Sequence, residues 1–283
     1  MQRKYPNDEA CLTWLFNSRY PDGITCQKCG VIGAKYHYVA SRKTFSCQWC
    51  GHQVSPAAGT IFDHSSTPLT KWFYGIYLMS QTRTGISAKQ LERELGVTYK
   101  TAWRIFKMIR SCLNEGSDAF GSNGGDVELD ETYVGGVRKG KRGRGAAGKT
   151  PVVGAIERTG KVKAEVMPNT QASTVIPFID NTVSLYATIH TDEYPVYNRL
   201  TQRGFNHLRV THSEGVFVRG NSHTNSIEGF WAQVKNAVSG VHHGVSPDYL
   251  QQYVNEYVFR YNHRKDVTPM FLTILDRASS LRD

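Results

Sequence analysis

The chain has 283 residues, of which 40% are hydrophobic, so it can form one large domain or two to three small ones with real cores. Lysine and arginine outnumber aspartate and glutamate by 34 to 24, and the net charge of +10 favours a polyanionic partner, nucleic acid before membrane. No segment reaches the roughly 18 apolar residues of a membrane span, and the polar start MQRKYPNDEA predicts no signal peptide. The six cysteines are therefore expected to be thiols or metal ligands.

Residues 1–55 predict a helix followed by a zinc ribbon. Residues 8–20 place apolar side chains, including Cys11, at helical spacing. Two Cys-x-x-Cys motifs follow, with 17 residues between them, and their members are Cys26, Cys29, Cys47 and Cys50. Each such turn presents two thiolates to one side of a tetrahedral ion, which predicts one structural Zn2+ rather than a redox pair or two disulfides. Between the motifs, residues 35–39 and 43–46 are typical of a hairpin.

Residues 56–115 predict a helix-turn-helix domain. After a Pro- and Gly-containing connection, apolar spacing indicates helices over 68–81, 87–95 and 98–113, with Gly96 between the last two. That length and turn suit a DNA-binding helix-turn-helix, although a plain three-helix packing unit is the alternative. The residues expected to face a DNA groove are Thr98, Tyr99, Lys100, Thr101 and Arg104.

A linker at 116–125, rich in Gly and Ser, precedes a change to strand periodicity. Alternation predicts an antiparallel meander of three strands, and further strands then alternate with helices. The expected strands are 127–134, 151–157, 162–167, 188–191 and 208–211; the expected helices are 172–183, 194–202, one from Asn225 onward and the aromatic segment 247–281. This order is that of the ribonuclease H-like fold, an α/β domain over 126–283 with a mixed five-stranded sheet. A basic loop interrupts the meander and is expected to contact DNA phosphate; its members are Arg138, Lys139, Lys141, Arg142, Arg144 and Lys149.

Three carboxylates are expected to meet in this domain. Asp130 lies on the first strand, Asp192 follows the fourth strand, and Glu228 lies on the helix that begins near Asn225. Such a set can hold two Mg2+ or Mn2+ ions, because Mg2+ takes few protein ligands beside water and phosphate. Lys235 lies two helical turns after Glu228, so both project from one face and the lysine can contact DNA phosphate.

Each acid has competitors. Asp126, Glu128 and Glu131 compete with Asp130, although alternation places Asp130 on one face with Glu128 and Thr132 while Glu131 points the other way. Glu193 competes with Asp192, which could simply cap the segment that follows it. Asn225, one turn before Glu228, is an additional or alternative ligand.

Together these motifs resemble the IS1595-type (ISXO2-like) insertion-sequence transposases. The matching segments are the two Cys-x-x-Cys turns, the GTIF…PLTKWFYGIYLM run, GISAKQLERELGVTYKTAW, ELDETYVGG, HTDEYPVY and HTNSIEGFWAQVK, and they span roughly Cys11 to Arg264 in the family's order. The resemblance implies a DDE transposase that cuts DNA at the element ends and joins the 3′-OH to target DNA. It implies Asp130, Asp192 and Glu228 as the acids and Lys235 as the basic residue that closes the motif; some branches carry Asn as the third ligand, which keeps Asn225 a candidate.

The resemblance also implies the surroundings of the reaction. Double-stranded DNA, as element ends and as target, is the expected partner, bound by at least a dimer because transposases pair two ends. The expected location is the bacterial cytoplasm, on the nucleoid when bound to DNA. Two alternatives stay open at this point: a DNA-binding regulator with an inert nuclease fold, and a structure-specific nuclease such as a resolvase.

Overall fold

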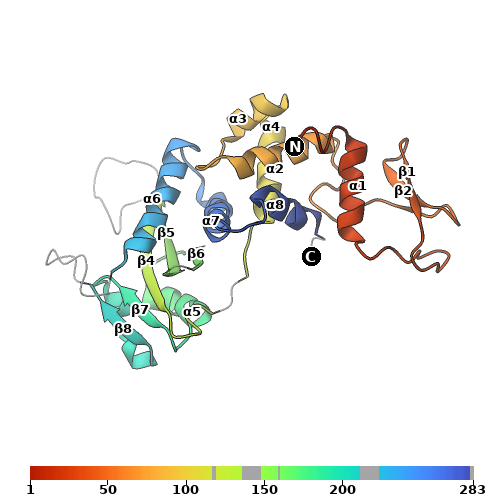
Figure 1. Cartoon of the computed structure of the whole chain (residues 1–283). Helices are drawn as coiled ribbons and strands as arrows, with labels where there is room; N and C mark the ends of the chain where they lie inside the picture. Colours follow the sequence, from red (N-terminus) through yellow and green to blue (C-terminus); the bar gives the residue numbers. More distant parts are fainter. Residues whose placement is uncertain (117–118, 136–147, 159, 211–222, 281–283) are drawn as a thin grey trace. The chain divides into compact units, whose positions relative to one another are not determined.

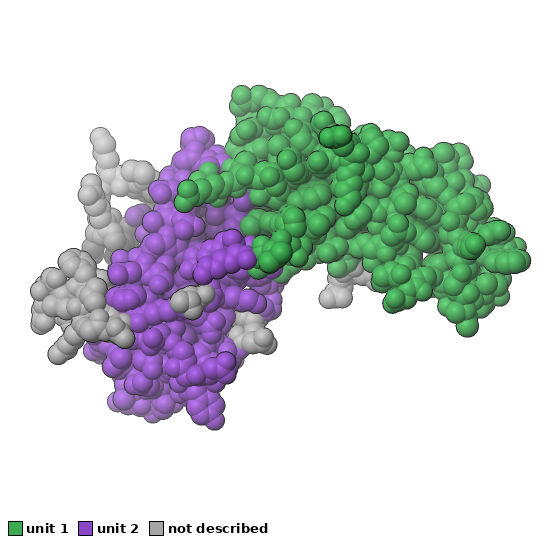
Figure 2. Space-filling view, viewed as in Figure 1, with its two compact units in different colours: residues 1–112, 266–283 green, residues 113–265 purple. Residues whose placement is uncertain are grey.

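The computed structural model describes residues 1–116, 119–135, 148–158, 160–210 and 223–280, which form two compact units (Figure 2). The first unit comprises Met1–Cys112 and Asp266–Asp283, and the second comprises Leu113–Lys265. The division after Cys112 lies beside the expected linker. The expected domain 126–283 differs at its end, because the chain from Asp266 onward groups with the first unit. Within the second unit, Glu115 pairs with His263, whose Nε2 lies 2.7 Å from the carboxylate.

The first unit begins with a helix and a small sheet (Figure 1). Helix α1 (Asp8–Arg19) begins where the Asn7 side chain accepts the N–H of Ala10 at 2.9 Å. The sheet is antiparallel in the order β1-β2-β3, with β1 at Tyr36–Val39, β2 at Thr44–Cys47 and β3 at Gln53–Val54. The predicted hairpin is therefore confirmed, and the short β3, which was not predicted, follows the second Cys-x-x-Cys turn.

The next three helices begin and end within two residues of their predicted bounds; they are α2 (Leu69–Gln81), α3 (Ala88–Leu95) and α4 (Tyr99–Ser111). Ser87 and Thr98 cap α3 and α4 through their side-chain oxygens, each of which accepts a backbone N–H of the first turn. Gly96 ends α3 with φ 56°, a left-handed conformation that glycine adopts without steric penalty.

The last helix, α8 (Met270–Ser279), packs against α2 and α1. Its apolar face is buried, and the Phe271 ring lies 5.9 Å from that of Tyr77 and 6.2 Å from that of Tyr5, measured between centroids. Helical spacing predicted that this segment is helical. It could not identify the surface that covers the apolar face, because that choice is made by tertiary packing.

The second unit is built on the expected mixed sheet of five strands, and their order in the sheet is β6-β5-β4-β7-β8. Its strands are β4 (Asp126–Gly135), β5 (Lys149–Glu157), β6 (Val162–Val166), β7 (Thr188–Thr191) and β8 (Asn206–Arg209). The first three form the antiparallel meander, and β7 and β8 run parallel to β4. Strand β4 therefore lies at the centre of the sheet, with an antiparallel neighbour on one side and a parallel one on the other.

The predicted helix 194–202 is absent, and the last strand is shifted along the chain. The segment predicted as helical over 247–281 forms two helices, and residues 263–269 between them lie outside any helix. Residues 194–202 form two short 3-10 helices, Pro195–Arg199 and Thr201–Arg203, instead of an α-helix. Gly204, with φ 91°, ends the segment before a stable α-helical nucleus can form. The shorter connection brings in β8 two residues earlier than expected, at Asn206.

Helices cover both faces of this sheet. On one face, α5 (Ala172–Thr182) and the first 3-10 helix pack on Val127 and Leu129 of β4. On the other face, α6 (Asn225–Gly240) and α7 (Pro247–Asn262) pack on a cluster that includes Val134. Figure 1 shows α6 running alongside β4 and β5. The even-numbered residues of β4, Asp130 among them, thus point to the α6 face.

Gly154 lets α6 approach the sheet closely. It is the direct partner of Asp130 in the β4–β5 pair. A Cβ atom added at this glycine would lie 2.7 Å from the Trp231 ring and 3.2 Å from the Ile227 side chain, both on α6. The indole therefore occupies the volume that a side chain at residue 154 would fill, directly beside Asp130.

We expect Gly154→Ala to destabilise the protein by about 1–3 kcal/mol, because the added methyl forces α6 away from the sheet. Urea unfolding of the full chain measures this. Gly229→Ala is the matched control: it lies within α6 with nothing within 4 Å of an added Cβ, and it should stabilise by about 0.5–1 kcal/mol. Equal stability of the two variants would contradict the close-packing account.

Candidate active site and zinc centre

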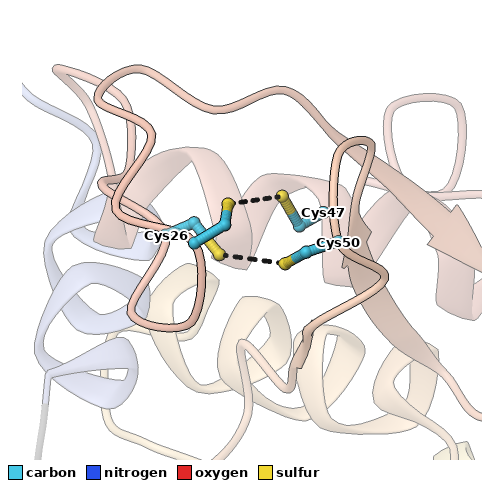
Figure 3. Close-up of side chains that lie close together, drawn as sticks. Cys26, Cys47 and Cys50 are labelled. Carbon is cyan, nitrogen blue, oxygen red and sulfur yellow. Dashed lines mark hydrogen bonds between the residues drawn. The ribbon is translucent and has the colours of Figure 1, made fainter.

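The four cysteines of the Cys-x-x-Cys motifs form one cluster. Their sulfurs lie within 4.8 Å of one another, with 3.6 Å between Cys26 and Cys50 and 4.0 Å between Cys29 and Cys47. Tetrahedral coordination with Zn–S bonds of about 2.3 Å would place sulfurs about 3.8 Å apart, so the four atoms fit one zinc ion. Figure 3 shows the side chains of Cys26, Cys47 and Cys50 pointing toward a common centre between the two turns.

The thiols perturb one another. The Tyr36 hydroxyl and the backbone N–H groups of Cys29 and Lys28 lower the pKa of Cys26 to about 5. The backbone N–H of His52 lowers the pKa of Cys50, but burial and the other three sulfurs outweigh it and raise that pKa to about 11. Thiols this close cannot all ionise without a cation between them, which fits a structural Zn2+.

Asp130 is held among other acids. It is half-buried at the centre of the sheet, facing α6. Burial raises its pKa well above the ordinary value, and the charges of Glu131, Asp192 and Glu228 raise it further. Neighbouring carboxylates repel the negative charge of Asp130. A bound cation would offset this repulsion and favour the ionised form, so this donor set fits divalent ions.

Asp192 follows β7 directly. Strand β7 runs parallel to β4 with Glu128 opposite His190, and continuing that register by two residues brings Asp192 level with Asp130. The Asp192 Oδ1 accepts the N–H of Tyr194 at 2.9 Å, which fixes the turn after the strand. Its competitor Glu193 is exposed.

Glu228 lies in the first turn of α6, and its Oε1 accepts the Thr224 hydroxyl at 2.8 Å. Asn225 is the first residue of α6 and Lys235 lies two turns after Glu228; both are exposed. The charges of Asp192 and Glu228 thus act on Asp130, but among the described residues only the four cysteines form a group of three or more with ligand atoms all within 4.8 Å of one another. The three acids share a region without forming so tight a group.

The competitors of Asp130 have other partners. Glu131 points to the α5 face, where it accepts the Tyr197 hydroxyl at 3.1 Å. Burial and the Glu131 charge raise the pKa of Tyr197, so this phenol stays protonated and donates. Asp126 lies 2.8 Å from the buried His190 ring.

Glu128 is fully buried, and the residue that pairs with it was missed in the sequence. The Arg158 guanidinium donates to Glu128 from Nε at 2.9 Å. Arg158 lies in the turn that follows β5, and no periodicity marks it. The role of Thr224 was also missed. Its position four residues before a candidate acid on a helix is a signal that could have identified it.

The residues expected to contact DNA have varied environments. At the start of α4, Tyr99 and Lys100 are exposed, whereas Thr98 is the helix cap and accepts the Thr101 N–H. Arg104 donates to Ser65 and Thr67 at 3.4 and 3.3 Å, which holds the segment before α2; its contact with DNA stays a prediction. Lys149 begins β5 opposite Gly135. The other five basic-loop residues lie outside the described residues; they are Arg138, Lys139, Lys141, Arg142 and Arg144.

We expect one zinc per chain in purified protein, and Cys47→Ser to release it, because three thiolates hold the ion more weakly than four. Metal analysis after gel filtration measures this, and amide exchange of residues 26–54 should rise together with the loss. Cys112→Ser is the control, since Cys112 lies outside the cluster, where its sulfur contacts the Met108 carbonyl at 3.5 Å. Retention of zinc by Cys47→Ser would contradict the assignment.

We expect Asp130→Asn to raise thermal stability at pH 7 in EDTA. Because the Asp130 pKa is higher in the folded state, folding binds protons, and stability falls as pH rises from the ordinary Asp pKa through the raised one. The gain should therefore vanish below about pH 4. Excess Mn2+ should stabilise the wild type, by about 2.7 kcal/mol at 100 times the dissociation constant, but not Asp130→Asn. Asp248→Asn, an exposed acid in the first turn of α7, should show neither effect.

Two family models and two curated relatives match this chain. Residues 123–262 match the ISXO2-like transposase domain, and residues 6–53 match the transposase zinc-ribbon domain. A protein of the transposable element ISH50 from Halobacterium salinarum is 27% identical, over 98% of both chains. A transposase-like protein of Haemophilus influenzae is 29% identical over 36% of this chain and 82% of its own length. In the described part of the chain, no helix is long and apolar enough to cross a membrane.

The two domain models match in the order that the motifs predict, and one relative matches along nearly the whole chain. The zinc-ribbon match covers both Cys-x-x-Cys turns, and the transposase-domain match covers β4 to α7, including all three acids. The chain belongs to the IS1595 (ISXO2-like) family of insertion-sequence transposases.

Proposed function

We propose that this chain is an active DDE transposase, which binds terminal inverted repeats and catalyses metal-dependent DNA cleavage and strand transfer. The observation that carries the proposal is the environment of Asp130, a half-buried carboxyl whose charged neighbours include Asp192 and Glu228 from two other elements. An inert fold has no physical need to gather acids that repel one another. The sheet order β6-β5-β4-β7-β8 supports a ribonuclease H-like catalytic domain.

The acids would act as metal ligands. Asp130, Asp192 and Glu228 would hold two Mg2+ or Mn2+ ions, with Asn225 as an additional or alternative ligand. Bound there, the ions would activate the attacking oxygen and stabilise the leaving oxygen of an in-line displacement at phosphorus. The turn that Asp192 makes with Tyr194 and the Thr224–Glu228 hydrogen bond restrict the carboxylates before metal arrives. Such preorganisation lowers the entropic cost of binding the ions.

The basic residues would place the DNA. Lys235, exposed two turns along α6 from Glu228, would contact phosphate near the scissile bond. The exposed start of α4, with Tyr99 and Lys100, would read bases of the terminal repeat, and the loop before β5 would contact phosphate. Pairing of two element ends requires at least a dimer on DNA, and size-exclusion chromatography of the paired complex would report its subunit number. The reaction takes place where the DNA is, in the cytoplasm.

We expect purified full-length protein to join an element end with a free 3′-OH to a plasmid in Mg2+ or Mn2+. EDTA and Asp192→Asn should abolish joining, because a carboxylate ligand is lost. Glu193→Gln is the matched control: this exposed neighbour should retain activity within about threefold, as surface substitutions of under about 0.5 kcal/mol do.

Two other outcomes would replace the proposal. Specific binding of the element end without cleavage or joining would indicate a DNA-binding regulator. Cleavage without joining would indicate a structure-specific nuclease.

A further inference from the structure

Glu128 stands out among the acids because donors occupy both of its oxygens. Its Oε2 accepts the backbone N–H groups of Ser226 at 2.8 Å and Ile227 at 3.1 Å. Its Oε1 accepts Arg158 Nε at 2.9 Å and the Ser226 hydroxyl at 3.1 Å, with His223 Nδ1 at 3.2 Å. The side chain has no exposed surface. A residue on β4 thus caps the first turn of α6.

This arrangement replaces the usual helix cap. The first N–H groups of a helix have no partner within it, and a side-chain oxygen of the residue before the helix normally accepts one of them. Thr224 occupies that position in α6 but makes no such bond. Because Glu128 accepts these N–H groups, the Thr224 side chain can turn away from them, and its hydroxyl donates to Glu228 Oε1 at 2.8 Å. The cap supplied from the sheet is therefore linked to the orientation of the proposed metal ligand.

Arg158 completes the contact. A buried carboxylate without a cation is strongly unfavourable, and the Arg158 side chain, 16% exposed, supplies the charge. Its second terminal nitrogen donates to the His223 carbonyl at 2.8 Å, and its first lies 3.6 Å from Asp126. One guanidinium thus joins the acids of β4 to the residue just before the α6 cap, in a geometry that a lysine ammonium cannot reproduce.

We propose that Glu128 and Arg158 are positioning residues, which fix the first turn of α6 on β4 and thereby set the separation of Asp130 and Glu228. Glu128 lies two residues before Asp130 on the same face of the same strand, so it ties α6 to the backbone that carries Asp130. The inference rests on the proposed function, because it assigns Glu228 a metal to hold. It also excludes Glu128 as a ligand: a cation there would face two N–H groups and a guanidinium.

The test is a double-mutant cycle on the full chain, read by Mn2+ binding in electron paramagnetic resonance. Glu128→Gln should weaken Mn2+ binding by about 10- to 100-fold, as loss of a group that orients a metal ligand does. In a Glu228→Gln background, the same change should cause no further loss. The reason is that the contact of Glu128 and Arg158 with the first turn of α6, here called the clamp, affects metal binding through Glu228. If the affinity losses of the two single variants multiply in the double variant, Glu128 is a direct ligand and the proposal is overturned. Unchanged Mn2+ affinity in Glu128→Gln would overturn it too.

A second pair of measurements needs no metal. In EDTA, the Ser226 and Ile227 amides should exchange faster in Glu128→Gln than in the wild type, because the neutral Gln oxygen is a weaker hydrogen-bond acceptor than the carboxylate. Glu256→Gln, which breaks another buried pair in the same unit, between Glu256 and Arg260 of α7, should leave these amides unchanged. Arg158→Lys keeps the charge but loses the bridging geometry, so it serves if Glu128→Gln does not fold, with the same cycle and a smaller loss expected.

The two proposals fail separately. Mn2+ binding by the wild type that does not depend on Asp130 would reject the proposed active site and leave the exchange result to judge the clamp. Unchanged exchange of the Ser226 and Ile227 amides in Glu128→Gln would reject the clamp whatever the metal does.

Discussion

The packing of α6 on β4 and β5 is the contact on which the second unit depends. It has an apolar part, in which Trp231 and Ile227 occupy the space above Gly154, and a polar part, in which Glu128 accepts the first N–H groups of the helix. The apolar part supplies the driving force, since burial of an aromatic side chain is among the larger gains available to a fold. The polar part supplies the register, because hydrogen bonds are directional and a helix sliding along the sheet would break them. Together they determine where Glu228 lies.

The acids of β4 show how one strand can keep several negative charges without losing stability. Glu128 is neutralised by Arg158, Asp126 lies against His190 and Arg158, and Glu131 accepts a phenol on the opposite face. Asp130 has a different environment, dominated by burial and by other carboxylates. The strand therefore separates acids with cationic or hydrogen-bonding partners from one acid whose charge is disfavoured by burial and by neighbouring carboxylates. The cation proposed for Asp130 would offset that cost. Such sites trade stability for function.

Period-two alternation and helical spacing predicted nearly every strand and helix, and alternation placed Asp130 on the same face of its strand as Glu128 and Thr132. The two Cys-x-x-Cys motifs predicted the zinc cluster, because Cys-x-x-Cys is a local motif whose geometry follows from its spacing. Alternation could not separate Asp130 from Glu128, since both lie on one face and only the tertiary partner of each distinguishes them. Arg158 lies in a turn that no pattern marks. Residues 194–202 were predicted as a helix because propensity does not measure how little chain joins β7 to β8.

The clustering of α8 with the first unit gives the chain an unusual order of assembly. The polypeptide leaves the first unit after Cys112, builds the second, and returns at Asp266. Phe271 of α8 lies beside Tyr5 and Tyr77, so this aromatic surface of the first unit is covered only after α8 has been synthesised. The first unit therefore cannot be complete until the second unit has been translated. A chain that ends before α8 would carry exposed aromatic side chains, which favour aggregation or proteolysis.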